Sequence, residues 1–178
     1  MIPDALTLWV CDDKIFVDES PKGFFIEVFD SEGNKLYHIE KSYQKFKVTE
    51  EHQKDILERF KSDRLVKIQG WERIKRSYQK FHYPEYFPAI QNLVVVDKKI
   101  YVQNLKKKHD SKEEEFIIMD LKGNTLKILS LPVTQKPHLY FRMTGLGPKF
   151  FTIAHDKCYY LVENEDEEEW ELHVTDIK

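Results

Sequence analysis

The residues that come nearest to a chemical site in this chain are His155 and Cys158, three positions apart. A histidine and a cysteine at this distance would suit a transition metal, or a nucleophilic thiol activated by the imidazole. The stretch His155-Asp156-Lys157-Cys158 is better explained as a hairpin turn that leads into a strand. The other histidines, at positions 38, 52, 82, 109, 138 and 173, form no pair at metal-ligand spacing. We therefore expect no metal site and no cofactor.

Residues 30–34 offer a second candidate, because Asp30, Glu32 and Asn34 alternate as in a calcium loop. The matching stretch at residues 120–124 has Lys122 in the middle position, which removes a ligand. Both stretches read Asp-x-x-Gly-Asn between apolar runs, which predicts a hairpin turn with glycine at positive φ. The aspartate would accept hydrogen bonds from backbone N–H groups within the turn.

Composition excludes several classes of function. The net charge is −3 with acidic and basic residues interspersed, so the chain has no basic surface for nucleic acid. It contains no Gly-rich phosphate loop, no Cys-x-x-Cys and no Gly-x-Ser-x-Gly. No run of 18 apolar residues predicts a transmembrane segment, and the chain as given is expected to be soluble. Cys11 and Cys158 are expected to act as small buried apolar residues rather than as a disulfide.

A repeat organises the chain. Residues 12–17 match residues 97–102 and resemble residues 155–160, and residues 28–36 match residues 118–126, with a shorter third copy at 174–178. Units of four short strands at this spacing are typical of β-propellers. The predicted fold class is mostly β: a partial propeller of about three four-stranded antiparallel blades, the third with three strands, and a helical insertion between blades one and two.

We expect a single domain over residues 1–178. Blade one spans 5–40, the helical insertion 41–83, blade two 84–132, a linker 133–148 and blade three 149–178. Thr49 is a predicted helix N-cap, and a second helical pattern places Trp71, Ile74, Tyr78 and Phe81 on one face. Trp9 and Trp170 are expected within or beside the packed strands.

The segment Pro84-x-x-x-Pro88-Ala89-x-x-x-Leu93-x-Val95-x-Asp97, together with residues 159–164 and 168–172, resembles a bacterial six-bladed β-propeller family related to NHL-repeat proteins. The resemblance implies the C-terminal half of such a propeller. It also suggests a periplasmic or secreted protein, while a cytoplasmic location stays open.

Three blades leave two apolar blade faces bare, and bare faces of this kind normally mark an interface. One solution is a homodimer in which two chains close a ring of six blades. The other is a fragment or short gene product with an opened arc. Sequence alone leaves both open.

Propellers usually bind ligands where the loops of all blades meet at the channel mouth. The favoured function is a non-catalytic binding or scaffold module for a protein, peptide or glycan. The alternative is a propeller-type metal-dependent hydrolase or lyase, so enzymatic activity is the less favoured hypothesis. The candidate binding residues at the channel mouth are His82, Tyr83, Tyr86, Gln103, His138 and Arg142.

Overall fold

The computed structural model describes residues 6–19, 22–62, 64–73, 84–104, 113–133, 151–164 and 169–177. It divides into two compact units, one that contains helices within Lys45–Phe87 and one that contains three β-sheets. Each unit is described by itself. The predominance of β-structure confirms the mostly β prediction.

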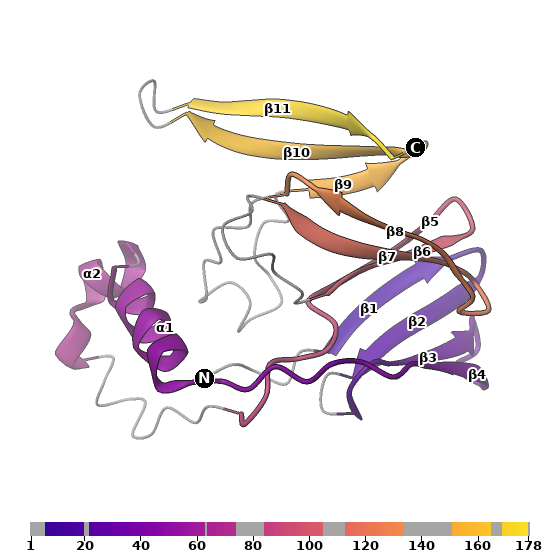
Figure 1. The fold of residues 1–178 in the computed structure, drawn as a ribbon, viewed down its shortest axis with the longest axis horizontal. Coiled ribbons are helices and arrows are strands. Elements are labelled where there is room, and N and C mark those ends of the chain that lie inside the picture. The colour runs from indigo at the N-terminus through magenta and orange to yellow at the C-terminus, as the bar shows by residue number, and fades with distance from the viewer. Residues whose placement is uncertain are drawn as a thin grey trace. The chain divides into compact units, whose positions relative to one another are not determined.

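Each of the three sheets is antiparallel, with its strands in chain order (Figure 1). Sheet one has four strands: β1 (Leu6–Cys11), β2 (Lys14–Glu19), β3 (Phe25–Asp30) and β4 (Lys35–Glu40). Sheet two also has four: β5 (Asn92–Val96), β6 (Lys99–Gln103), β7 (Glu114–Asp120) and β8 (Thr125–Leu131). Sheet three has three: β9 (Phe151–Ala154), β10 (Lys157–Asn164) and β11 (Glu169–Asp176). Strand numbers of four, four and three agree with the repeat read from the sequence.

The first hairpin of every sheet turns in the same way. Two residues join the strands in each case, and both have φ between 48° and 58°, which is the left-handed region. Within the described residues, these turns account for every non-glycine residue with positive φ. Two consecutive residues of this kind make a type I′ turn, whose twist matches that of the flanking strands. The turn residues are Asp12 and Asp13, Asp97 and Lys98, and His155 and Asp156.

The strand registers repeat as well. The lysine that begins the second strand lies opposite the aspartate that ends the third: Lys14 opposite Asp30, Lys99 opposite Asp120, and Lys157 opposite Asp176. This shared register identifies β11 as the third strand of its sheet. The predicted repeat is therefore present in three dimensions.

The Asp-x-x-Gly-Asn turns are held by their aspartates, as predicted. Asp30 Oδ1 accepts hydrogen bonds from the backbone N–H groups of Glu32 (2.9 Å) and Asn34 (2.8 Å), and Oδ2 accepts one from Asn34 Nδ2 (3.0 Å). Asp120 repeats the same three bonds. These hydrogen bonds lower the pKa of both carboxyl groups, led by the bond from the asparagine side chain. Both carboxylates are engaged inside their own turns.

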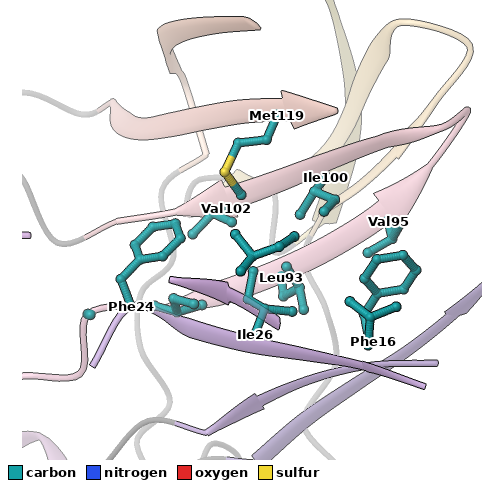
Figure 2. Close-up of a cluster of buried hydrophobic side chains, with 12 residues drawn as sticks. Phe16, Phe24, Ile26, Leu93, Val95, Ile100, Val102 and Met119 are labelled. Carbon is teal, nitrogen blue, oxygen red and sulfur yellow. The ribbon is translucent and has the colours of Figure 1, made fainter. Parts of the chain in front are cut away.

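The sheets pack face against face through two apolar clusters. The first joins sheets one and two, where Phe16, Ile26 and Val28 lie against residues of β5 and β6 (Figure 2). The second joins sheets two and three, where Tyr101 and Phe116 lie with Phe151, and the two phenylalanine rings meet edge to face at 5.6 Å. Trp9 packs against both clusters, as expected of a residue beside the strand packing. Trp170 is 51% exposed, so it is not a core residue of this chain.

The helical unit contains α1 (Glu50–Ser62) and α2 (Arg64–Gln69). Thr49 Oγ1 accepts a hydrogen bond from the His52 N–H (3.3 Å), which confirms the predicted N-cap, and Glu50 and Glu51 lie in the first turn. Residues 71–73 are helical, and the rest of the second predicted helix lies outside the described residues. Neither helix in the described part of the chain has the length and apolar character needed to cross a membrane.

Gly123 and Gly33 offer a matched test of the packing between sheets one and two. Both occupy the same turn position with nearly equal φ, 88° and 86°. A Cβ on Gly123 would lie 2.6 Å from Ile39 Cγ2, whereas a Cβ on Gly33 would have nothing within 4 Å.

We expect Gly33→Ala to lower the free energy of unfolding by about 1 kcal/mol, because alanine is strained at positive φ. Gly123→Ala should cost a further ~1–3 kcal/mol, because the new methyl group must displace Ile39. Urea unfolding of the two variants and the parent protein measures the difference. Equal costs would show that Ile39 does not press on this turn.

Candidate functional site

The three sheets are linked by polar contacts at the end where their first hairpins turn. Asp97 Oδ2 accepts a hydrogen bond from the backbone N–H of His155 (2.8 Å), and Lys99 Nζ lies 2.5 Å from Asp156 Oδ1. Burial raises the pKa of the Cys11 thiol, and a hydrogen bond from the Lys98 backbone opposes this shift. The first hairpin turns of sheets two and three therefore each contact the sheet before them.

Asp18 lies at the opposite end of sheet one, near the end of β2. It is 1% exposed, and its Oδ1 has no hydrogen-bond partner among the residues that the structure describes. Burial, followed by the negative charge of Glu19, raises the pKa of this carboxyl group from 3.8 to about 7. A carboxylate in such surroundings gains strongly from a proton, a cation or a hydrogen-bond donor.

Gln103 ends β6 and is 3% exposed. Its backbone carbonyl accepts a hydrogen bond from the Gln91 N–H (2.9 Å), but no described residue donates to its side-chain Oε1. The neighbouring Asn104 donates from Nδ2 to Glu115 Oε1 (2.7 Å). The end of sheet two thus has a buried amide oxygen, on Gln103, beside the hydrogen-bonded pair Asn104 and Glu115.

Asp18 and Gln103 occupy the same position of the repeat. Each is the fifth residue after the first hairpin turn, on the sheet face that carries Phe16 or Tyr101 two residues earlier. The corresponding residue in sheet three is Leu161. Two consecutive sheets therefore each bury, at the same end, an oxygen that no described residue partners. A buried acceptor without a donor costs about 1–3 kcal/mol, and such groups are uncommon in folded proteins.

These two oxygens can act as acceptors for O–H or N–H donors of a ligand that enters from the ends of β2 and β6. Asp18 adds a negative charge once it loses its proton. Within the described residues, no three His, Cys, Asp or Glu side chains converge as a metal site would require.

Of the six residues predicted to bind at a channel mouth, Gln103 is the one the structure places in this site. Tyr86 belongs to the helical unit, where it pairs with Lys47 in an isolated β-bridge, and Lys45 Nζ lies 5.5 Å from the centre of its ring. The other four, His82, Tyr83, His138 and Arg142, lie outside the described residues.

The two cysteines have the predicted character. Cys158 is fully buried in the second apolar cluster, and burial raises its pKa to about 11, which suppresses thiolate chemistry at neutral pH. Cys11 is partly buried against the first cluster, and both are free thiols. His155, predicted to lie in a hairpin turn, does so.

The sequence analysis did not single out Asp18, which ends the expected strand directly before the turn that contains Ser20 and Pro21. The sequence repeat contained the information that could have identified Asp18. Extending the match of residues 14–17 with 99–102 by one position aligns Asp18 with Gln103, which is also a polar residue at the end of an apolar strand.

Compared with known proteins, the chain matches no family model, no curated protein and no solved structure.

Asp18 should make the stability of the protein fall as pH rises. The folded protein holds the Asp18 proton up to about pH 7, whereas the unfolded chain releases it near pH 4. Between these values the folded state binds more protons, so the free energy of unfolding decreases with pH and levels off above about pH 7. A shift of about three units corresponds to a loss of at most ~4 kcal/mol.

Urea unfolding from pH 4.5 to pH 8.5 measures this slope. Asp18→Asn removes the titrating group, so the variant should be more stable than the parent above pH 7 and lack this part of the pH dependence. Asp13→Asn is the matched control, because Asp13 is exposed in the turn of the same hairpin and asparagine accepts its positive φ. Parallel curves for parent and Asp18→Asn would contradict the assignment.

Proposed function

We propose that the three sheets are consecutive blades of a β-propeller. Three observations support this: the common strand order, the identical first hairpins, and the packing of each sheet face against the next. Propellers are built by this kind of radial repetition, typically with four to eight blades. The resemblance to bacterial six-bladed, NHL-related propellers belongs to this proposal and is consistent with it.

As function, we propose a non-catalytic binding module with its ligand site at the end of the sheets where β2 and β6 stop. The observation that carries this proposal is the pair of buried oxygens, Asp18 Oδ1 and Gln103 Oε1, which lie at equivalent positions and have no partner in the part of the chain that the structure describes. Two such groups at one repeat position destabilise the unliganded protein. A ligand that supplies donors would recover that cost on binding.

The chemistry of the two residues defines the ligand class. Both offer oxygen acceptors, one from a carboxyl group and one from an amide, so the ligand must present O–H or N–H donors. Hydroxyl groups of a glycan and N–H groups of a peptide share this property. The raised pKa of Asp18 adds a condition, since the carboxyl group has an O–H to donate while it keeps its proton and offers a negative charge to a ligand only after losing it.

The alternative is a metal-dependent hydrolase or lyase of propeller type. It would require Asp18 to be joined by further ligands, since metal sites of enzymes usually have at least three protein ligands. Elemental analysis of the purified protein, before and after dialysis against a chelator, tests it. Metal retained by the parent and lost from Asp18→Asn would favour the enzyme.

The binding proposal predicts opposite effects of one substitution on stability and on affinity. Gln103→Met keeps the length of the side chain and replaces the amide, whose Oε1 has no donor among the described residues, with apolar atoms. We expect the variant to unfold at higher urea than the parent, by about 1 kcal/mol in free energy, and to lose ligand binding. Binding is measured on a printed glycan array and on a printed peptide array, at pH 8, with parent and variants in parallel.

Asp13→Asn, at the hairpin end of sheet one, serves as the control that should bind like the parent. Signal on one array alone, lost in Gln103→Met and Asp18→Asn, identifies the ligand class. Binding that survives both substitutions would place the site elsewhere. A Gln103→Met variant that is less stable than the parent would show that Oε1 has a partner in the folded protein.

A further inference from the structure

Sheet one presents an apolar face that no other described sheet covers. Four residues of its first hairpin lie on the face opposite Phe16. Leu8 is 56% exposed and Val10 is 65% exposed. These four have the same residue types, in the same order, as four residues of sheet two: Leu8, Val10, Ile15 and Val17 correspond to Leu93, Val95, Ile100 and Val102.

In sheet two these four positions form the interface with the sheet before it. They are at most 4% exposed and lie against Phe16 and Ile26 of sheet one (Figure 2). The corresponding residues of sheet three, Phe151, Ile153 and Cys158, are buried with residues of sheet two in the same way. Sheet one therefore carries a complete surface for a preceding sheet.

Sheet three has the complementary surface. Leu172 and Val174 of β11 occupy the positions of Ile26 and Val28 in sheet one, counted from the aspartate that ends each strand. Ile26 and Val28 are fully buried, whereas Leu172 is 64% exposed and Val174 49%. Leu161 pairs with Leu172 and lies on the same exposed face, as does Trp170.

We propose that these two faces bind each other between two copies of this chain, sheet three of one against sheet one of the other. The choice of a second copy follows from the residues, because the free faces repeat the two halves of the interfaces already present within the chain. The number of sheets is also consistent with a pair of chains. Counting the three sheets of the described residues, two copies supply six, within the range of four to eight in known propellers, whereas one copy supplies three and three copies nine. Two equivalent contacts then close the ring about a twofold axis. This inference rests on the proposal that the sheets are propeller blades, and it does not depend on the binding proposal.

The test is the mass of the full chain in solution, by light scattering behind a sizing column, over a dilution series. We expect about 43 kDa, twice the chain mass of 21.4 kDa. Leu8→Lys and Leu172→Lys each place a charge in both contacts of the ring. If the lysine weakens each of the two contacts tenfold, the dissociation constant of the dimer rises at least ~100-fold. Both variants should therefore elute as monomers.

Leu126→Lys is the matched control. Leu126 is 57% exposed, close to the value for Leu8, but lies on β8 of sheet two, outside both proposed faces. It should remain dimeric. Circular dichroism confirms that each variant is folded, and the milder pair Val10→Thr and Val174→Thr replaces any variant that is not.

Three results would overturn the inference. They are a folded monomer for the parent chain at every concentration, a dimer that only one of the two lysine variants dissociates, and a series of masses that grows with concentration. The second would indicate like faces in contact, and the third a contact that does not close.

Discussion

The burial of one sheet face against the next is the interaction on which the β unit depends. A single antiparallel sheet of three or four short strands has an apolar face that it cannot hide by itself. In this chain the first hairpin of each following sheet supplies the cover, with Leu93, Val95 and Ile100 against sheet one and Phe151 and Ile153 against sheet two. The strand order, the type I′ turns and the lysine–aspartate register all serve to present that hairpin in the same way.

The two ends of the sheets have different roles. At the hairpin end, Asp97 accepts from the His155 backbone and Tyr37 Oη donates to the Leu121 carbonyl (2.7 Å), so neighbouring sheets are held at fixed positions. At the other end, Asp18 Oδ1 and Gln103 Oε1 are buried without a donor among the described residues. The cost of each, about 1–3 kcal/mol, is comparable to what one fully buried Leu or Ile contributes. The burial of the two apolar clusters can therefore offset the free-energy cost of these two buried oxygens.

Much of the β architecture was predictable because it is encoded locally. Residues 12–13 and 97–98, with glycine and asparagine in residues 30–34 and 120–124, fix the turns, and alternating apolar residues fix the faces. The candidate site was harder to predict from the sequence. Gln103 was among the residues predicted at the channel mouth. Asp18 was not, because its burial depends on the packing of a neighbouring sheet. Trp170 was expected beside packed strands for its size, but it lies on a face that the described sheets do not cover.

Leu161 connects the polar end with the free faces. It occupies the position of Asp18 and Gln103 but is apolar, and it lies on the exposed face of sheet three with Leu172. Within the chain, where the sheets are covalently joined, each interface has at this position an oxygen without a partner among the described residues. A contact between separate chains has no such connection and must also offset the loss of translational freedom. An unpartnered oxygen there would weaken association, and leucine adds apolar area instead. In a ring of two copies, the polar positions would thus fall at the four interfaces within the chains, and the two interfaces between chains would be apolar throughout.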